Sequence, residues 1–263
     1  MSKKFLPEST YKVDSTMTYA NLIFLHETKT TIAGKVMRIN LQNKTFEVDL
    51  GGNISGYMSY SDSTLYPIYK ENGSLSINVY SLVGKTILVK IVSVEGNNIK
   101  LSRKLNMLEA FESLKSETEF SYGTIVGYSH LCAFVDIGGG ILGKIYGKHF
   151  APTIFKDITD IGIPVYTNIP VTVLDCDTDN YRFSLSRMAA LPPIEETVKE
   201  NTCVSCKVFN PLGDGLGYYA LIDNNICGII DSPNVKLKYG DEVLAYVKSL
   251  SSKGPRLSLV EIF

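Results

Sequence analysis

The feature that most constrains the fold is a pattern of short segments that occurs three times along the chain. Residues 30–104, 119–188 and 201–263 share one order of segments, and in each segment apolar and polar residues alternate. Alternation with a period of two is typical of strands that bury one face. Several short strands separated by turns favour a small closed barrel, because closure leaves no strand edge exposed.

Four anchor positions align the repeats. They are the small residue near the start, the aromatic residue that leads the second strand, the glycine that leads the third strand, and a leucine in the last strand. The anchors are Gly34, Phe46, Gly56 and Leu101 in the first repeat, Gly123, Phe134, Gly143 and Leu185 in the second, and Cys206, Tyr219, Gly228 and Leu257 in the third.

The segments between the repeats have a different character. Residues 105–118 carry apolar residues at 105, 108, 111 and 114, a spacing that predicts a short linker helix. Residues 189–200 form a second linker, in which a short helix is expected after Pro192 and Pro193. Residues 1–29 form an N-terminal extension that is weakly helical over 17–28 and is expected to pack on the first barrel.

Composition excludes several classes of protein. The chain has 26 Lys and Arg against 27 Asp and Glu, so any attraction to phosphate has to come from local patches. No apolar run is long enough to span a bilayer, and no membrane association is expected. Five scattered cysteines do not form a disulfide framework, which favours a cytoplasmic setting.

The repeats resemble the ribosomal S1 RNA-binding domain family. The second repeat matches best, through residues 132–140, 143–146 and 182–187, and the first matches through 46–51, 56–59 and 101–104. The third is the most diverged. The resemblance implies an all-β chain of three tandem five-stranded OB-fold (S1-type) barrels with short helical linkers. The whole is similar to a short bacterial ribosomal small-subunit S1-like protein.

The resemblance also implies a site. In the family, an exposed patch on the second and third strands binds single-stranded RNA, with bases stacked on aromatic rings and phosphates near Lys and Arg. The aromatic residue of the second strand is expected to face outward while its neighbours fill the barrel. The expected RNA-binding residues are Phe46, Tyr57, Ser59, Lys100, Arg103 and Lys104 in the first repeat, Phe134, Lys144, Tyr146, Arg182 and Arg187 in the second, and Tyr219 and Arg256 in the third.

The three repeats are unequal. The first has nine Lys or Arg against five Asp or Glu and is the electrostatic candidate. The second has the better stacking pair, Phe134 and Tyr146. The third places Asp231 where RNA would lie, so it is expected to contact the ribosome or another protein instead. The strand pattern alone leaves open that Phe46, Phe134 and Tyr219 are core residues.

The predicted function is therefore non-enzymatic binding of single-stranded RNA (mRNA) in translation or RNA metabolism. Two alternatives remain: an OB-fold adaptor that binds proteins, and an S1-type regulator of virulence or gene expression. The C-x-x-C pair at 203–206 lies on a strand, where residues three apart face opposite sides, so it does not predict a metal site. The glycines before Lys144 predict a turn between strands. No catalytic residue, metal or cofactor is expected.

Overall fold

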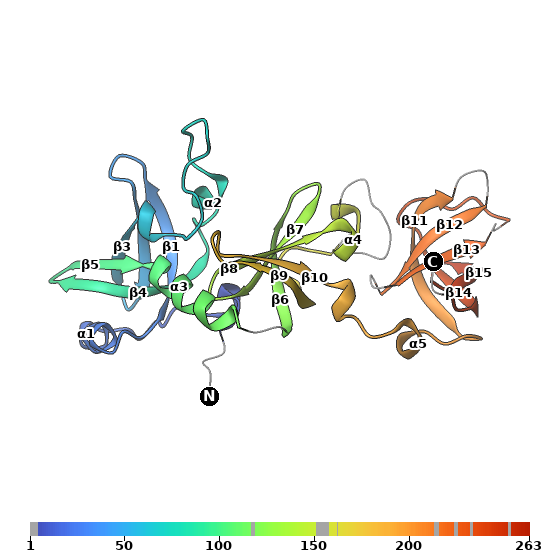
Figure 1. Cartoon of the computed structure of the whole chain (residues 1–263), viewed down its shortest axis with the longest axis horizontal. Coiled ribbons are helices and arrows are strands. Elements are labelled where there is room, and N and C mark those ends of the chain that lie inside the picture. The colour runs from blue at the N-terminus through green and yellow to red at the C-terminus, as the bar shows by residue number, and fades with distance from the viewer. Residues whose placement is uncertain are drawn as a thin grey trace.

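The computed structural model describes residues 5–116, 119–150, 158–161, 163–212, 216–223, 226–231, 234–251 and 254–263. Three closed barrels follow one another along the long axis of the molecule (Figure 1). In the first barrel the strands are joined in the order β1-β2-β3-β5-β4. Their bounds are β1 (Ile32–Asn40), β2 (Thr45–Gly51), β3 (Ile54–Ser59), β4 (Thr86–Glu95) and β5 (Asn98–Ser102).

The second and third barrels repeat this strand order. The second consists of β6 (Glu119–Tyr128), β7 (Cys132–Gly138), β8 (Ile141–Tyr146), β9 (Asn168–Asp177) and β10 (Arg182–Ser186). The third consists of β11 (Cys203–Leu212), β12 (Gly217–Ile222), β13 (Ile226–Asp231), β14 (Glu242–Ser249) and β15 (Arg256–Ile262). The prediction of an all-β chain with three five-stranded barrels is confirmed.

A contact between the third and last strands explains two of the sequence anchors. The glycine that leads each third strand lies beneath the leucine of the last strand, and a Cβ placed on it would come within 2.7, 2.2 and 2.7 Å of a leucine side-chain atom in the three barrels. A larger residue would displace a buried leucine, so glycine is required at this position. The three pairs are Gly56 with Leu101, Gly143 with Leu185, and Gly228 with Leu257.

Short helices connect the strands and the barrels. The α-helices are α1 (Tyr19–Glu27), α2 (Ile77–Tyr80), α3 (Arg103–Leu114), α4 (Gly147–Phe150) and α5 (Ile194–Thr197). The 3-10 turns are η1 (Glu8–Thr10), η2 (Tyr60–Asp62), η3 (Ile158–Ile161) and η4 (Met188–Ala190). In the described part of the chain, none of the helices combines the length and the apolar character that a bilayer crossing needs.

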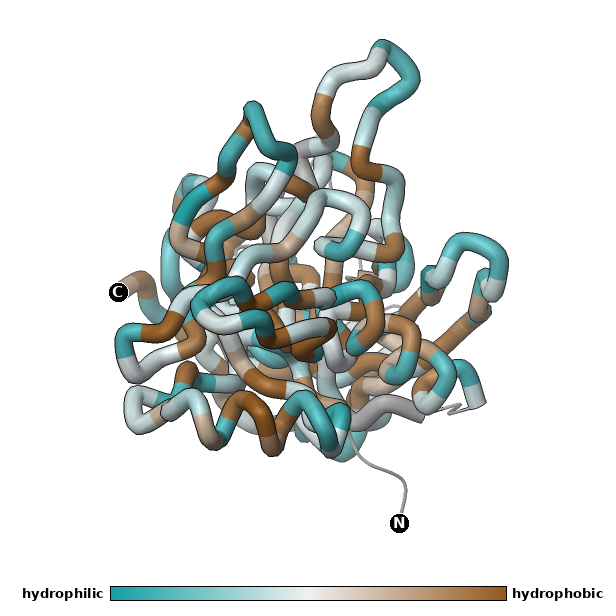
Figure 2. The backbone as a smooth tube through the Cα atoms, turned by 90° about the vertical axis from the view of Figure 1, so that its left-hand side faces the viewer, coloured by the Kyte–Doolittle hydropathy of each residue, from teal (hydrophilic) through white to brown (hydrophobic). Residues whose placement is uncertain are grey.

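Helix α3 lies between the first two barrels (Figure 1). Met107, Ala110, Phe111 and Leu114 are buried and join the core of the second barrel. Leu105, expected on the buried face of this helix, is 47% exposed. The apolar part of the buried face thus begins at Met107, after the buried polar residues Arg103 and Asn106. Viewed from the first-barrel end, the projecting loops are coloured mainly as hydrophilic, while hydrophobic residues gather along the packed strands (Figure 2).

Candidate nucleic-acid interface

The strand register places Phe46 inside the first barrel. Phe46 is opposite Met58, is 0% exposed, and has its ring 5.3 Å from that of Tyr60. The expectation that Phe46 faces outward is therefore wrong, and this residue is unavailable for stacking on RNA. Its neighbour Glu47 occupies the outward position, because a shift of one residue along a strand moves a side chain to the other face.

A bulge common to the three barrels shows which residues correspond. In each barrel the register between the first two strands shifts once, and the residue after the shift pairs with one outward residue of the second strand. These pairs are Arg38 with Glu47, Gly127 with Phe134, and Asn210 with Tyr219. The second strand therefore offers a carboxylate, a phenyl ring and a phenol ring at the same place in the three barrels.

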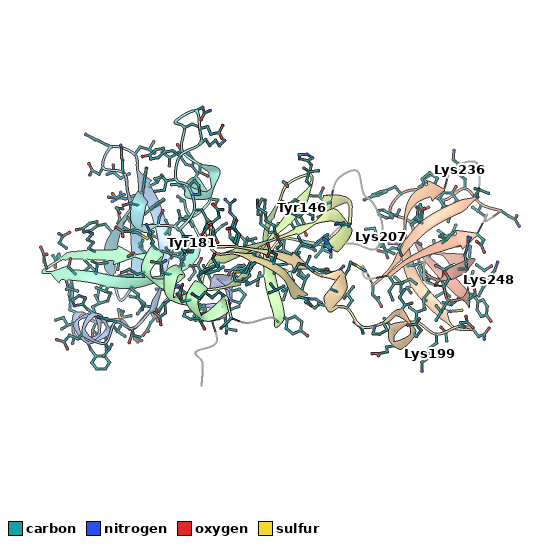
Figure 3. All side chains as sticks on the ribbon, in the orientation of Figure 1. Tyr146, Tyr181, Lys199, Lys207, Lys236 and Lys248 are labelled. Carbon is teal, nitrogen blue, oxygen red and sulfur yellow. The ribbon has the colours of Figure 1, made fainter. Side chains whose placement is uncertain are left out.

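The outer face of β7, β8 and β10 gathers the candidate residues of the second barrel. Phe134 pairs directly with Lys144, whose Nζ lies 6.0 Å from the centre of the phenyl ring. Tyr146 lies two residues further along β8 on the same face and is 47% exposed (Figure 3). Gly127 beside Phe134 has open space where a Cβ would be. The phenyl ring is therefore not covered from that side.

Arg182 lies at the edge of this face, next to the first barrel. Its guanidinium is 5.8 Å from the ring of Tyr66, which belongs to the connection between β3 and β4. The Tyr66 hydroxyl accepts a hydrogen bond from the Leu142 backbone N–H at 2.7 Å and donates to the Tyr181 carbonyl at 3.3 Å. Burial raises the pKa of Tyr66 to about 12, so its hydroxyl stays neutral, and its two hydrogen bonds hold the ring against the second barrel.

A cleft of about 700 Å³ opens between the first and second barrels. Phe134, Lys144 and Arg182 line it from the second barrel, together with Tyr128 and Tyr166. Its other wall is formed by residues of the first barrel that precede and begin β4: Ser81, Leu82, Gly84, Lys85 and Thr86. The face that carries the stacking residues thus continues into a hollow shared by two barrels.

The corresponding face of the first barrel is less suited to RNA. Glu47, at the place of Phe134, forms an ion pair with Arg38. Ser59, at the place of Tyr146, donates from its hydroxyl to Asp62 at 2.5 Å and accepts from the Asp62 N–H at 3.2 Å, so it caps η2. Tyr57 and Lys100 lie side by side across β3 and β5 and are half-buried. They are the remaining candidates on this face.

Two arginines expected to contact phosphate are buried instead. Arg103 is 7% exposed and Arg187 is 3% exposed. Arg103 donates to the Ser63 carbonyl at 3.0 Å, and Arg187 donates to the Phe150 carbonyl at 3.0 Å. Each arginine thus fixes the backbone after the third strand of its own barrel. Their assignment to phosphate contacts is wrong, because each guanidinium is buried and is bonded to a backbone carbonyl of its own barrel.

Ion pairs also reduce the excess positive charge of the first repeat. Arg38 pairs with Glu47, Lys90 with Glu109, and the buried Arg103 with Glu8. Lys104 is exposed at the start of α3 and lines a smaller hollow that also includes Arg182. The net charge of the repeat therefore overstates the charge that its surface offers to phosphate.

The third barrel keeps the fold but neutralises the corresponding face. Arg256, at the place of Lys100, donates to Asp231 at 2.8 Å, and Lys248 lies 3.5 Å from the same carboxylate. Tyr219 packs against a buried cluster that joins Phe209, Leu221 and Cys227 to core residues of the second barrel. Lys207, Lys236 and Lys248 point from different sides of this barrel (Figure 3).

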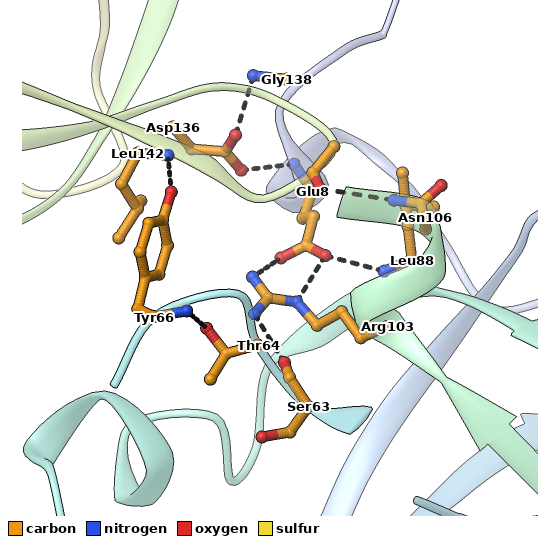
Figure 4. Close-up of polar contacts among 11 residues, drawn as sticks. Glu8, Ser63, Thr64, Tyr66, Leu88, Arg103, Asn106, Asp136, Gly138 and Leu142 are labelled. Atoms are coloured by element: carbon orange, nitrogen blue, oxygen red, sulfur yellow. Dashed lines mark hydrogen bonds and ion pairs between the residues drawn. The ribbon is translucent and has the colours of Figure 1, made fainter. Parts of the chain in front are cut away.

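A polar cluster that the sequence did not indicate joins the first two barrels to the N-terminal segment (Figure 4). The Glu8 carboxylate accepts from Arg103 Nε at 2.8 Å and Nη2 at 2.7 Å, and from the Leu88 N–H at 3.0 Å. The Glu8 N–H donates to Asp136 at 2.8 Å. Glu8 thus touches a strand of each barrel, and the N-terminal segment holds their relative position.

The glycine turn of the second barrel belongs to this contact. Gly140 has a φ of +81°, and a Cβ on it would lie 2.5 Å from Arg103 Nη2 and 3.0 Å from the Glu8 carboxylate. Asn106 of α3 donates to the neighbouring Gly139 carbonyl at 3.3 Å. The turn therefore needs glycine both for its backbone angles and for the close approach of the first barrel.

Asp136 lies at the centre of the same contact and is 3% exposed. It accepts hydrogen bonds from the N–H groups of Glu8 and Gly138 at 2.8 and 2.9 Å. Burial, followed by the negative charge of Glu8, raises the pKa of Asp136 to about 7. The cluster therefore changes its charge near neutral pH.

The cysteine pair of the third barrel is split between two faces. Cys203 is exposed and Cys206 is buried, as expected for positions three apart on β11. Burial raises the pKa of the Cys206 thiol to about 12. The described residues contain no group of three or more His, Cys, Asp or Glu side chains arranged to hold a metal ion.

Comparison with known proteins supports the resemblance seen in the repeats. The chain is 32% identical over 166 residues to small ribosomal subunit protein bS1 of Staphylococcus saprophyticus, covering 61% of this chain and 40% of that protein. It is 29% identical over 201 residues to the Staphylococcus aureus protein of the same name, covering 71% and 48%. The chain thus spans less than half the length of these relatives. No family model matches the chain.

Among solved structures, one similar chain is a multidomain protein with nucleic acid binding domains from Streptococcus pneumoniae. The match covers 88% of this chain and 73% of that chain, with 14% identity and a TM-score of 0.27. The strand order within each barrel and the similarity to bS1 together confirm the resemblance to tandem S1-type proteins.

Proposed function

We propose that this chain is an RNA-binding protein of the S1 type that holds single-stranded RNA on the β7–β8–β10 face of its second barrel. The observation that supports this most strongly is the pair formed by Phe134 and Lys144, with Tyr146 on the same face. A base stacked on an aromatic ring contributes about 1–3 kcal/mol, and a neighbouring cation attracts the phosphate that follows.

The first and third barrels take smaller parts in this function. Tyr57 and Lys100 give the first barrel one ring and one cation, next to the unfavourable charge of Glu47. In the third barrel, Asp231 forms an ion pair with Arg256, and its carboxylate repels phosphate. The third barrel therefore contacts protein instead of RNA. The chain thus binds RNA mainly through its second barrel. The first barrel adds a minor contact with RNA, and the third barrel contacts protein.

The name of the relatives supports a role in translation. They are ribosomal proteins of the small subunit, which favours mRNA as the RNA and the ribosome as the assembly that this chain approaches. The aligned region makes up 40% of the Staphylococcus saprophyticus protein. A cytoplasmic location stays a prediction.

Titration of a fluorescent, unstructured RNA of about 20 nucleotides tests the function by anisotropy. The wild-type chain is expected to bind with an affinity that falls as salt rises. Phe134→Ala and Tyr146→Ala should each weaken binding by about five- to a hundredfold, corresponding to one lost stacking contact. Tyr122→Ala is the matched control, since Tyr122 is a 64% exposed aromatic residue on β6 of the same barrel. Absence of binding at low salt would reject the proposal.

A further inference from the structure

The cleft between the first two barrels carries positive charges on both of its walls. Lys85 enters it from the first barrel, and Lys144 and Arg182 enter it from the second. Among the described residues, no carboxylate forms an ion pair with any of these three side chains. The cleft is therefore electropositive from both walls.

The acidic residues at the floor of the cleft do not cancel this charge. Glu8 is bound in two places by the Arg103 guanidinium. The pKa of Asp136 is raised to about 7, so part of the population is neutral at neutral pH. Burial is the main cause that lowers the pKa of Lys85, and the charge of Arg103 acts in the same direction, while Glu8 and Asp136 oppose it. A phosphate beside Lys85 would favour the charged form of its ammonium group.

The second-barrel wall of the cleft also supplies aromatic rings. Phe134, Tyr128 and Tyr166 line the second-barrel side, and Tyr166 is 58% exposed. Gly127 leaves open the space beside Phe134, between the stacking face and the hollow. A base can thus lie on Phe134 while the adjoining backbone turns toward the first barrel.

The cleft is held in place before any ligand arrives. Glu8 bonds to Arg103 and Leu88 of one side and to Asp136 of the other, and Tyr66 accepts a hydrogen bond from the Leu142 N–H. Preformed geometry lowers the entropic cost of binding. The two walls therefore act as one surface.

We propose that the two barrels form one composite site, in which RNA bound on Phe134 continues into the cleft and a backbone phosphate contacts Lys85 of the first barrel. This rests on the proposed function and deepens it. The first barrel then contributes through the residues before β4, and its β2–β3 face is not the main contact. The site selects a flexible single strand, because a duplex cannot place one phosphate between the walls while stacking an exposed base on Phe134.

Substitution of Lys85 tests this, using the full chain and the same RNA. Lys85→Ala should weaken binding by about tenfold, the loss of one charge-assisted contact. It should also reduce the slope of log affinity against log salt by about 0.7, the value for one phosphate contact on a single strand. Lys85→Arg should restore most of the affinity. Lys70→Ala is the control, because Lys70 is an exposed cation of the same β3–β4 connection and does not line the cleft.

The outcomes distinguish the composite site from the RNA-binding function on which it rests. If Phe134→Ala weakens binding while Lys85→Ala leaves affinity and salt slope unchanged, the composite site is rejected and RNA binding stands. If Lys70→Ala weakens binding as much as Lys85→Ala, the effect is general charge and the composite site is again rejected. If the wild-type chain binds no single strand, both proposals fail. Equal melting temperatures of the variants exclude misfolding as the cause.

A fluorescent reporter gives a second, independent readout. The sequence contains no tryptophan, so Tyr166→Trp places a lone indole at the rim of the cleft. Binding of RNA should quench this indole, with the same saturation point as the anisotropy curve. Saturated anisotropy with unchanged indole fluorescence would show that the strand bypasses the cleft and would overturn the inference.

Discussion

Glu8 and Arg103 form a doubly hydrogen-bonded ion pair, buried between the first two barrels although the residues are 95 positions apart. Removing one member of a buried pair leaves an uncompensated charge, which costs about 3–5 kcal/mol. Glu8→Ala should therefore lower the free energy of unfolding of the unit formed by these barrels by this amount, measured in urea.

The exposed pair Arg38–Glu47 provides the control for that experiment. Arg38 and Glu47 side chains are 76% and 37% exposed, so solvent screens their attraction. Glu47→Ala should change the free energy of unfolding by less than about 1 kcal/mol. Equal effects of Glu8→Ala and Glu47→Ala would contradict the role assigned to the N-terminal segment.

The pKa of Asp136, raised from 3.8 to about 7, predicts how stability depends on pH. Because the folded state binds this proton more tightly than the unfolded state, the contribution is fully present below pH 3.8 and is lost as pH rises through about 7. The melting temperature of the wild-type chain should therefore fall between pH 5 and pH 8.

Asp136→Asn removes this titration. The variant should be less stable overall, because an amide cannot accept from both the Glu8 and Gly138 N–H groups as the carboxyl does. Its melting temperature should nevertheless change less between pH 5 and pH 8. A variant with the full pH dependence of the wild type would show that another group controls it.

The first barrel offers a test by gain of binding. Glu47→Phe places an aromatic ring at the position of Phe134 and frees Arg38 from its ion pair. RNA affinity should rise by about fivefold or more, since one stacked base contributes about 1–3 kcal/mol. Anisotropy titration measures this. Glu47→Leu, which removes the same charge without adding a ring, should give a smaller gain, and an equal gain would assign the effect to charge alone.

The architecture was predictable because its determinants are local and repeated. Alternation with a period of two predicts the strands. The glycine of the third strand and the leucine of the last strand recur in all three repeats, which predicts the same strand order in each barrel. An alignment of the repeats on their aromatic residues predicts the wrong outward residue on the second strand of the first repeat, because it equates Phe46 with Phe134. Alignment on Gly51 and Gly138, which end β2 and β7, places Phe46 opposite Ala133 and Glu47 opposite Phe134.

The contacts between barrels could not be predicted in this way. Glu8 and Asp136 are 128 positions apart and belong to segments with no shared pattern. Their contact depends on how two barrels pack, and local periodicity carries no information about that. The burial of Arg103 and Arg187 could not be predicted for a similar reason. Each arginine donates to a carbonyl in the segment after the third strand, and the strand pattern does not predict where that segment lies.

Photo-crosslinking of a 4-thiouridine RNA to the full chain, followed by mass spectrometry of the peptides, tests the central claim most directly. We predict crosslinks on β7 and β8, at or beside Phe134 and Tyr146, with a second group near Lys85. Crosslinks confined to the third barrel, or to the β2–β3 face around Glu47, would contradict the account.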